Sequence, residues 1–386
     1  MRPAAKLAAL VLAAGCSSRA PGFKPLLPLG EATVIETTLA SLRRAGIGDI
    51  TAVVGHRAAD LLSVLAGLPV RVVVNENYSD GMFSSVLAGV KALPADADAF
   101  FLLPADIPLV SSHTVRLLAR AAAKTGAAVT YPVFRGERGH PPLIAARLAP
   151  AILAWTGEGG LCGLLAQYDA AACELPVLDE GTQLDIDTAD DYGLLVSRRA
   201  GRHFPSAAEC DAILARLAVP APVIGHSRAV AAMARTLAAR LNLAGLALDA
   251  GLIVAAGLLH DLAKGQPDHP RRGARLLRSL GYPRVAAIIA VHHDLTIPEG
   301  PPPVPDEAAV IFLADKLVHN ASIVSLDERF ARSREKFADP AARAAADGRQ
   351  ALARRIAAAV EQISGAKLGE ALGEALADAS RLKGES

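Results

Sequence analysis

The sequence predicts an α/β domain with a doubly wound, mostly parallel sheet, followed by an all-α domain. In the first half of the chain, short β-rich runs alternate with helical stretches, a pattern typical of βαβ units. After Arg198 and Arg199 the pattern becomes helical, with few β-branched runs and with proline-rich breaks. A chain of 386 residues is long enough for two domains that each bury their own core.

The change in pattern places the domain boundaries. We expect the α/β domain over residues 1–198, a linker over 199–221, the all-α domain over 222–330, and C-terminal helices with a frayed tail over 331–386. Ligands bind beyond the carboxyl ends of parallel strands. The β-rich runs are residues 8–13, 50–55, 70–75, 99–103 and 127–134, and the positions at or just after their ends carry Gly15, Gly55, Asn75 and Asp106.

The overall charge gives no reason to expect nucleic acid or a membrane as a partner. The formal net charge is +1, so a phosphate-bearing ligand needs a local site. The cysteines lack the paired spacing of a disulfide framework or a zinc cluster, which favours a reducing cytoplasm. They are Cys16, Cys162, Cys173 and Cys210.

The N-terminus has two interpretations. MRPAAK, the apolar residues 7–14 and then Gly15-Cys16 resemble a bacterial lipoprotein signal. The alternative is a buried first strand over residues 7–13 that enters a glycine turn. That turn continues into a phosphate-binding pattern, which would lose its strand if the chain were cleaved before Cys16. We therefore expect a strand and a cytoplasmic location, since no other segment reaches the roughly 20 apolar residues of a spanning helix.

The turn after the first strand is suited to a triphosphate. It reads LAAGCSSR over residues 12–19 and is followed by GFKPLLPLG over residues 22–30. Small residues allow backbone N–H groups to approach phosphates, and Arg19 and Lys24 supply cations that offset their charge. A small-residue turn is also common as a purely structural feature, but the two basic residues favour a phosphate site.

Two acidic segments lie further along the chain. In PADIP, residues 104–108, an apolar strand delivers Asp106 at its carboxyl end, where a carboxylate is well placed to hold magnesium on a nucleotide. The alternative is a loop aspartate that turns the chain before the next proline. In LDIDTADD, residues 184–191, alternation puts Asp185 and Asp187 on one face of a strand, and Thr188 or Asp190 can cap the following helix.

Taken together, these motifs resemble the molybdenum cofactor cytidylyltransferase family, within the MobA-like nucleotidyltransferases of Rossmann-like fold. In that family the first turn reads LAAG in relatives that use the cytidine nucleotide and LAGG in guanylyltransferases, so Ala14 indicates CTP. The resemblance covers about residues 7–196, through LAAGCSSR, FKPLLPLG, VVGHR, NENYSDGMFSSVLAG, LPADIPLV, RGHPPLI and LDIDTADDY.

The resemblance implies the reaction and its partners. CMP would pass from CTP, or a nucleotidyl group from another NTP, to a molybdopterin-type acceptor with release of pyrophosphate and without a covalent protein intermediate. Mg²⁺ would be the cofactor, and a molybdoenzyme or its chaperone the protein partner. Two alternatives stay open: an acceptor that is a sugar or polyol phosphate, and a nucleotide-sensing regulatory protein.

The resemblance also assigns roles to individual residues. Relatives commonly have Arg-Met-Gly before the lysine, whereas here Arg19-Ala20-Pro21-Gly22 moves the glycine by one position while the spacing from Arg19 to Lys24 is kept. The nucleotide would be lined by Leu12, Ala14, Gly15 and Arg19, its phosphates would meet Lys24, and Mg²⁺ would be held by Asp106 and Asp187. The base and the acceptor would be bordered by Asn75, Gly81 and Ser84, and the pterin side would be closed by Gly139-His140-Pro141.

Histidines gather in the second half of the chain. Five of the ten histidines lie between residues 226 and 293, close to well-placed aspartates. We expect four carrier helices, over residues 227–241, 250–264, 283–295 and 306–319, because bundles build metal sites from separate facing helices. His260 and Asp261 follow an apolar run, where two buried polar groups are costly without a partner. Imidazole and carboxylate ligands suit several divalent metals.

This half resembles the HD phosphohydrolase superfamily over about residues 222–325, through HSRAVAAMARTLA, LLHDLAKG, HPRRGARLL, IIAVHHDL and FLADKLVH. The resemblance implies a divalent-metal centre of one or two ions and leaves the substrate open among phosphomonoesters, phosphodiesters and nucleotides. The first position would be held by His226, His260, Asp261 and Asp315, the second by His269, His292 and His293, and Lys264 would meet a phosphate.

Overall fold

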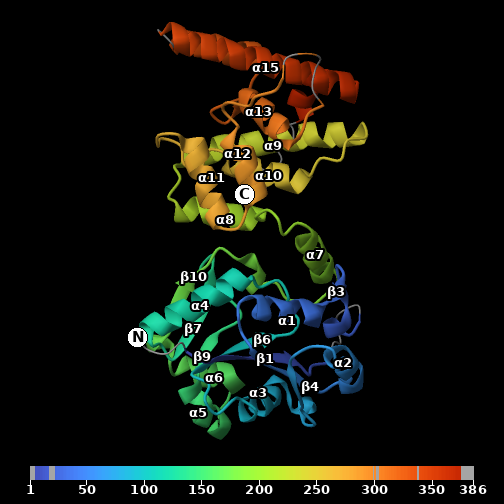
Figure 1. The fold of residues 1–386 in the computed structure, drawn as a ribbon, viewed down its shortest axis with the longest axis vertical. Coiled ribbons are helices and arrows are strands. Elements are labelled where there is room, and N and C mark those ends of the chain that lie inside the picture. Colours follow the sequence, from blue (N-terminus) through green and yellow to red (C-terminus); the bar gives the residue numbers. More distant parts are fainter. Residues whose placement is uncertain (1–4, 17–21, 299, 301–303, 337–338, 375–386) are drawn as a thin grey trace. The chain divides into compact units, whose positions relative to one another are not determined.

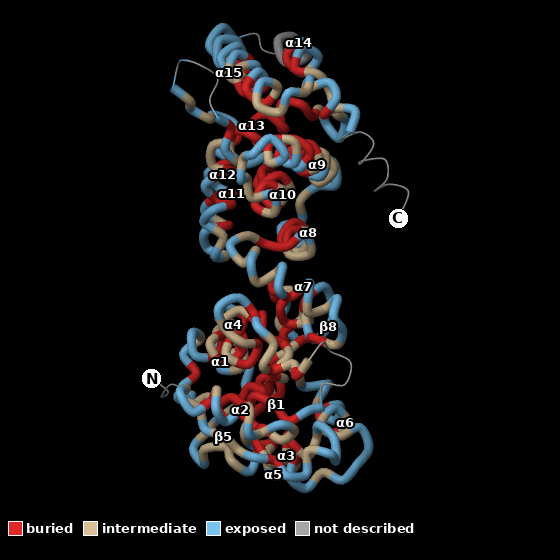
Figure 2. Tube along the Cα trace, turned by 90° about the vertical axis from the view of Figure 1, so that its right-hand side faces the viewer, coloured by how far each residue is buried: buried red, intermediate tan, exposed pale blue. Residues whose placement is uncertain are grey.

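A computed structural model describes residues 5–374, apart from residues 17–21, 299, 301–303 and 337–338, and describes only the backbone of residues 332–336. The chain forms two compact units, Met1–Ala200 and Gly201–Ser386. Each unit has its own buried interior, seen as red segments in Figure 2.

An eight-stranded sheet forms the centre of the first unit (Figure 1). The strand order is β10-β7-β9-β6-β1-β4-β5, with β8 paired to β7. Neighbours are parallel, except that β9 runs antiparallel to β6 and β7, and β8 to β7. The strands are β1 Leu7–Ala13, β4 Asp49–Val54, β5 Arg71–Val74, β6 Ala99–Pro104, β7 Val129–Phe134, β8 Glu137–Arg138, β9 Leu143–Ala145 and β10 Cys173–Pro176; β2 Pro28–Leu29 and β3 Ala32–Thr33 form a separate hairpin.

Helices cover both faces of this sheet. Alternate side chains of a strand point to opposite faces: Ala9 and Val11 pack with α1, α2 and α4, whereas Ala8 and Leu10 pack with α3, α5 and α6. The α-helices are α1 Val34–Arg44, α2 Ala58–Leu65, α3 Met82–Lys91, α4 Ser112–Thr125, α5 Ala149–Ala154, α6 Gly160–Ala166 and α7 Ala189–Ala200, and the 3₁₀ helices are η1 Lys24–Leu26, η2 Tyr78–Asp80, η3 Ala146–Leu148, η4 Asp169–Ala171 and η5 Glu180–Thr182. The predicted doubly wound, mostly parallel fold is confirmed.

The strand order reverses beside β1. The chain runs from β1 to β4 and β5 on one side and returns on the other side of β1 as β6. In doubly wound sheets, ligands usually bind at such a reversal, beyond the carboxyl ends of the two central strands. Leu12 pairs with Pro104, so the chain segments that carry Ala14 and Asp106 leave the sheet side by side.

The second unit is helical, as predicted. Helix α10 is apolar around its circumference and packs against α8, α9, α12 and α13, which makes it the centre of the core. The elements are α8 Ala207–Arg216, α9 Ala221–Leu243, α10 Ala250–Leu259, α11 His269–Ser279, α12 Pro283–Ala290, α13 Glu307–Lys316, α14 Leu326–Lys336 and α15 Pro340–Ser364, with a hairpin of β11 Val318–His319 and β12 Ser322–Ile323. None of the described helices is both long and apolar enough to cross a bilayer.

The expected linker over residues 199–221 contains a packed helix. Ser206 caps α8, and its hydroxyl and the Glu209 carboxylate form a reciprocal capping box. Cys210 and Ile213 are buried, and α8 packs against α10. An apolar face with a helix start signal was therefore present in the segment that was assigned to a linker.

Three carrier helices are shorter than the sequence predicts. The helix predicted over 250–264 ends at Leu259, the one over 283–295 ends at Ala290, and the one over 306–319 ends at Lys316. His260 is the C-cap of α10, and His292 and His293 lie in the turn after α12. The direction of a histidine side chain in such a turn is not set by the periodicity of a helix.

Candidate active sites

An acidic cluster lies at the carboxyl edge of the sheet in the first unit. The Nζ atom of Lys24 lies 3.2 Å from Oδ2 of Asp106 and 2.9 Å from Oδ1 of Asp187. Burial lowers the pKa of Lys24, but the Asp187 and Asp106 carboxylates raise it more, which keeps the ammonium group charged. Residues that are far apart in the sequence thus form one charged group at the carboxyl edge of the sheet.

Local structure holds both carboxylates in place. Asp106 lies in the turn after β6, and the Thr38 hydroxyl donates to the carbonyl oxygen of Ala105 at 2.9 Å. The segment 184–187 is irregular and not the strand that the alternation predicted. It ends at α7, where the backbone N–H groups of Asp187 and Thr188 donate to Asp191 Oδ2.

A buried aspartate that the sequence analysis did not single out joins the two acidic segments. Oδ2 of Asp179 accepts hydrogen bonds from the backbone N–H of Ser111 at 2.8 Å and the hydroxyl of Thr114 at 2.6 Å. Its Oδ1 accepts one from the N–H of Gly181 at 3.2 Å. Ser111 and Thr114 begin α4, soon after Asp106, and Gly181 leads to Asp187, so Asp179 connects the two halves of the cluster.

Asp185 and His140 lie near the same cluster. Burial, together with Asp187 and Asp106, raises the pKa of Asp185. Burial lowers the pKa of His140, and this effect outweighs the nearby charges of Asp106 and Asp185, which raise it. The backbone N–H of His140 donates to the Thr182 carbonyl at 2.8 Å, which places the predicted Gly139-His140-Pro141 segment against the chain that leads to Asp187.

Asn75 connects β5 to α3. Its Nδ2 donates to the hydroxyls of Ser84 at 2.8 Å and Ser85 at 3.0 Å. The Ser84 hydroxyl in turn donates to the Gly81 carbonyl at 2.8 Å. Gly81 caps α3 with φ of 93°, a conformation that favours glycine. These predicted nucleotide or acceptor residues therefore form one hydrogen-bonded group at the carboxyl edge.

The glycine turn lies against the next strand end. A Cβ atom on Gly55 would lie 2.6 Å from Cβ of Tyr78 and 2.9 Å from Cβ of Ala14, so only glycine fits between them. Ala14 and Leu12 are buried and Gly15 is exposed. Arg19, the second predicted cation, lies outside the described residues.

The donor set of this cluster fits Mg²⁺. Carboxylate oxygens are the ligands that Mg²⁺ prefers in proteins, usually one or two of them together with phosphates of the substrate. Asp106 and Asp187 supply two such groups, and Lys24 offers a cation for phosphate. The arrangement can therefore hold a metal–triphosphate complex at this edge of the sheet.

The second unit contains a buried centre of histidines and aspartates. Nε2 of His226 lies 3.0 Å from Oδ1 of Asp315 and 3.7 Å from Oδ2 of Asp261. Nε2 of His260 lies 3.4 Å from Oδ2 of Asp261 and 3.7 Å from Oδ1 of Asp315. These four residues, from α9, the end of α10 and α13, form the first predicted metal position.

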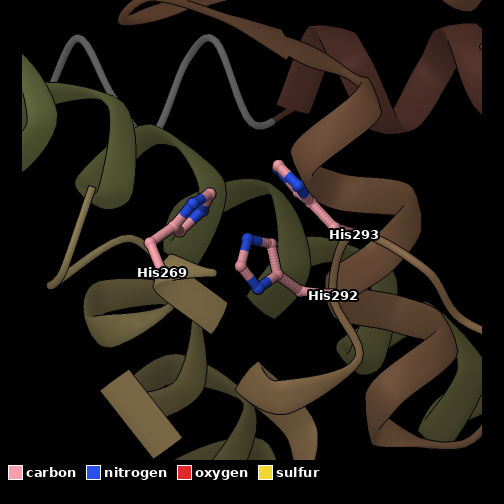
Figure 3. Close-up of side chains that lie close together, drawn as sticks. All are labelled: His269, His292 and His293. Carbon is pink, nitrogen blue, oxygen red and sulfur yellow. The ribbon is translucent and has the colours of Figure 1, made fainter. Parts of the chain in front are cut away.

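Three further histidines form a second group beside the first. Figure 3 shows the rings of His269, His292 and His293 gathered around a common space, one from the start of α11 and two from the turn after α12. Their ligand atoms lie within 4.8 Å of one another. Nε2 of His269 lies 3.1 Å and Nε2 of His292 lies 3.7 Å from Oδ1 of Asp261, so the Asp261 carboxylate lies between the two groups.

The polar atoms of the centre fit divalent cations. The Nε2 atoms of three buried or half-buried histidines and Oδ1 of Asp261 make no hydrogen bond of good geometry within the described structure; the histidines are His260, His269 and His292. Buried polar atoms without partners are costly. A cation between these atoms removes that cost, and histidine with carboxylate is a donor set for zinc, iron, manganese and similar ions.

Backbone carbonyls orient the ligand histidines. Nδ1 of His226 lies 2.8 Å from the Asn320 carbonyl, Nδ1 of His260 lies 2.8 Å from the Gly257 carbonyl, and Nδ1 of His292 lies 2.7 Å from the Ile289 carbonyl. Such contacts place the proton on Nδ1 and leave Nε2 as the ligand atom, the usual arrangement around metal-binding histidines.

A close helix contact brings His226 and His260 together. A Cβ atom on Gly257 of α10 would lie 2.7 Å from Cα of Ala231 on α9. The missing side chain lets the two helices approach, and the His226 and His260 ring centres lie 5.2 Å apart. Gly257 is therefore a structural requirement of the centre that its histidine motif alone does not show.

The electrostatics of the centre are set by its two carboxylates. Burial raises the pKa of Asp315, but Lys316, His226 and His260 lower it by more, so that it lies well below its usual value. Burial lowers the pKa of His260, and Asp261 and Asp315 raise it more, to about 9. A divalent ion bound by these residues would compete with protons for the same atoms.

Two lysines accompany the centre. The predicted phosphate residue Lys264 forms an ion pair with Asp261. The second, Lys316, was not predicted: it is buried, and its Nζ lies 2.8 Å from Oδ2 of Asp315 and 3.2 Å from the His292 carbonyl. A lysine next to Asp315 in an apolar helix was the available signal. Lys316 ties the first ligand group to the turn that carries the second.

The sheet with its acidic cluster and the helical bundle with its histidine–aspartate centre define a nucleotidyltransferase-type domain followed by an HD-type domain. Residues 9–172 match the MobA-like NTP transferase domain family, and residues 223–319 match the HD domain family. The chain belongs to the MobA-like NTP transferase family and carries an HD domain after it.

Known relatives resemble the first unit. Nicotine blue oxidoreductase of Paenarthrobacter nicotinovorans is 33% identical over 194 residues, which are 48% of this chain and 95% of that protein. The molybdenum cofactor cytidylyltransferase of Escherichia coli K12 is 25% identical over 47% of this chain and 92% of that protein. The bifunctional protein GlmU of Kineococcus radiotolerans is 32% identical, but this chain spans only 35% of its length. The crystal structure of Rv0371c from Mycobacterium tuberculosis H37Rv is 27% identical, with a TM-score of 0.45 and coverage of 50% of this chain and 99% of that chain.

Proposed function

We propose that the first unit transfers CMP from CTP to the terminal phosphate of a molybdopterin-type acceptor and releases pyrophosphate. The observation that carries the proposal is the meeting of Lys24 with Asp106 and Asp187 at the carboxyl edge of the sheet. An oxygen of the acceptor phosphate attacks the α-phosphorus, and the bond to the bridging oxygen of the β-phosphate breaks. Asp106 and Asp187 would hold Mg²⁺, which would neutralise the charge of the triphosphate.

The residues of this unit position and neutralise rather than react covalently. Lys24 offers a charged donor to the phosphates, which suits a reaction in which electrostatic stabilisation and positioning supply most of the rate. The group of Asn75, Gly81 and Ser84 orders the edge where the base and the acceptor would lie. Cys16 has no role in this scheme.

The choice of CTP and acceptor rests on the likeness to the Escherichia coli cytidylyltransferase and on Ala14 in the first turn. Likeness to the domain alone does not name the reaction, because one relative carries the name of an oxidoreductase. A sugar or polyol phosphate as acceptor is the alternative. We further propose that the reaction takes place in the cytoplasm, where a molybdoenzyme or its chaperone would receive the product.

Pyrophosphate release tests this proposal. The full-length chain is incubated with Mg²⁺, a molybdopterin-type cofactor and CTP, GTP, ATP or UTP in turn, and then with a sugar 1-phosphate or a polyol phosphate in place of the cofactor. We expect release with CTP only, and only when the molybdopterin-type cofactor is present. Release with a sugar or polyol phosphate alone would assign the other acceptor, and no release with any pair would refute nucleotidyl transfer.

For the second unit we propose a metal-dependent phosphohydrolase with two ions that share Asp261. The supporting observation is the position of its two carboxylate oxygens, one toward His226 and His260 and the other toward His269 and His292. Divalent ions held by these residues would supply Lewis acidity at the scissile phosphate. Lys264, at the rim of the centre, supplies a cation for the same group.

Hydrolysis of model substrates tests the second activity. The chain is loaded with Mn²⁺, Fe²⁺, Zn²⁺ or Mg²⁺ and assayed with p-nitrophenyl phosphate and bis(p-nitrophenyl) phosphate. We expect p-nitrophenol release that disappears with Asp261→Ala. Release that is unchanged in this variant would exclude the centre as its source.

A further inference from the structure

The face of α11 that is turned to solvent carries an unusual concentration of positive charge. The chain as a whole is balanced, with 40 Lys and Arg against 39 Asp and Glu. Residues 269–293, however, contain five arginines and no acidic residue. Four of the five lie on α11, and all four are exposed: Arg271, Arg272, Arg275 and Arg278.

These four arginines are not used by the fold. Their side chains make no hydrogen bond or ion pair with another residue that the structure describes. The fifth, Arg284, pairs with Asp249 at 3.0 Å. The buried face of α11 consists of small and apolar residues, among them Gly273 and Leu277. Like charges that lie close together repel one another, and these four arginines have no carboxylate partner among the described residues of their own domain. Such a cluster is suited to an anionic ligand.

The cluster begins at the metal centre. His269 is the first residue of α11, and its Nε2 lies 3.1 Å from Oδ1 of Asp261. At about 100° per residue, Arg272 projects only about 60° away from His269 around the helix, one turn further along. Arg275 follows on the next turn, and the helix from His269 to Arg278 rises about 13 Å. The positive face therefore extends away from the second metal position, well beyond the reach of one phosphate group.

We propose that α11 binds the part of the substrate that lies beyond the scissile phosphate, and that this part is a chain of phosphate groups. The inference rests on the proposed phosphohydrolase activity and narrows its substrate class to compounds with several linked phosphates, such as nucleoside polyphosphates. Guanidinium groups suit this ligand because they bind phosphate oxygens in pairs and stay charged. A simple phosphomonoester has nothing to place on this face.

Hydrolysis of such a substrate has a simple balance. Water adds to the terminal phosphorus, the adjacent P–O–P bridge breaks, and orthophosphate and the shortened chain leave with release of a proton. Arg272 and Arg275 take no part in bond making. They would be substrate-positioning residues that act on the binding of the phosphate chain.

Binding of inorganic tripolyphosphate, compared with orthophosphate, tests the proposal without reference to turnover. The full-length chain is first freed of metal with a chelator, because tripolyphosphate itself binds divalent cations. The double variant Arg272→Gln/Arg275→Gln is compared with a control double variant Arg228→Gln/Arg354→Gln. The control arginines are exposed and lie in the same unit, but each has a carboxylate partner, Asp211 and Asp327 respectively.

We expect the α11 variant to raise the tripolyphosphate Kd about tenfold and to change the orthophosphate Kd less than twofold, because several charge-assisted bonds are lost only with the longer ligand. The control should match the wild type for both ligands. Binding of tripolyphosphate to the first unit should be equal in the wild type and both variants, so a difference in Kd between them reports on α11. A tripolyphosphate Kd within twofold of the wild type in the α11 variant overturns the proposal.

Two further measurements separate this inference from the activity on which it rests. In the metal-loaded chain, the α11 variant should have a higher KM, and therefore a lower kcat/KM, for tripolyphosphate. Its kcat/KM for p-nitrophenyl phosphate should equal that of the wild type. If neither compound is hydrolysed while the binding difference remains, the hydrolase assignment fails and the anion face stands. If a single-stranded oligonucleotide displaces tripolyphosphate and binds more tightly, with a steep salt dependence, α11 is a nucleic-acid surface and the proposal is wrong.

Discussion

Oδ1 of Asp261 lies 3.1 Å from Nε2 of His269, which begins a different helix. The other oxygen of the same carboxylate faces His226 and His260 at 3.7 and 3.4 Å. One buried side chain thus stands between two groups of histidines. This arrangement supports the proposal of two metal positions rather than one, and it makes the contribution of each group of histidines separately testable.

The acidic cluster of the first unit should be essential for transfer but not for folding. Asp106→Asn or Asp187→Asn should lower CTP-dependent pyrophosphate release by about 10²-fold or more, because each would remove negative charge from the proposed Mg²⁺ site. Both side chains are partly exposed, at 27% and 40%, so thermal unfolding should change little. Asp190→Asn, in the first turn of α7, is the control and should stay active; full activity of Asp106→Asn would remove the proposed site.

Asp179 should affect both stability and transfer. Asp179→Ala leaves the donors of Ser111, Thr114 and Gly181 without their acceptor, which should lower the free energy of unfolding by about 1–3 kcal/mol. Because Asp179 joins the two acidic segments, its loss should also lower kcat for pyrophosphate release at temperatures where the variant remains folded. Chemical denaturation and the transfer assay measure the two effects. Unchanged stability would show that the three hydrogen bonds are replaced by water.

Two glycine substitutions should change stability in opposite directions. Gly257→Ala places a Cβ 2.7 Å from Cα of Ala231, so α9 and α10 must separate, at a cost of about 1–3 kcal/mol. Gly348→Ala in α15 meets nothing within 4 Å and should stabilise the helix by up to about 1 kcal/mol. Thermal unfolding of the two variants gives the comparison, and bound metal should fall only in the first. Equal melting temperatures would contradict the tight contact at Gly257.

The second unit should fold by itself. A fragment that starts at Gly201 includes α8, whose Cys210 and Ile213 are buried and which packs against α10. It should melt cooperatively and bind metal, whereas a fragment that starts at Pro222 lacks α8 and should be less stable. Circular dichroism and metal analysis of both fragments test this. A fragment from Gly201 that stays unfolded would show that the helical unit depends on the first.

Much of the fold follows from local patterns in the sequence. The alternation of β-rich and helical runs predicted the sheet, because strands buried on both faces are apolar throughout, and β1 is such a strand. One helix was not predicted: α8 lies in the segment expected to be a linker, where Ser206 and Glu209 form a capping box. Proline-rich and charged neighbours hid its apolar face.

The sites were predictable in composition but not in geometry. Asp106 follows a strand end and His226 lies on a helix, as the sequence predicts, whereas Asp187 lies in an irregular segment and His292 in a turn. Pairings across long distances have no local signal: neither the bond between Asp179 and Thr114 nor the contact of Lys316 with the His292 carbonyl follows from any spacing. The helix ends before His260 and His292 depend on tertiary packing, which overrides helical periodicity.

Metal stoichiometry of the purified full-length chain tests the central claim most directly, namely that Asp261 joins two metal positions. After saturation and removal of free metal, elemental analysis should give about two transition-metal ions per chain, apart from any Mg²⁺ at Asp106 and Asp187, for the wild type and for Asp268→Asn. Asp268 is an exposed carboxylate beside His269, and its variant serves as the control. Asp261→Ala should lose metal from both positions, while cytidylyl transfer by the same protein stays near that of the wild type. Two ions retained by Asp261→Ala, or none bound by the wild type, would contradict the account.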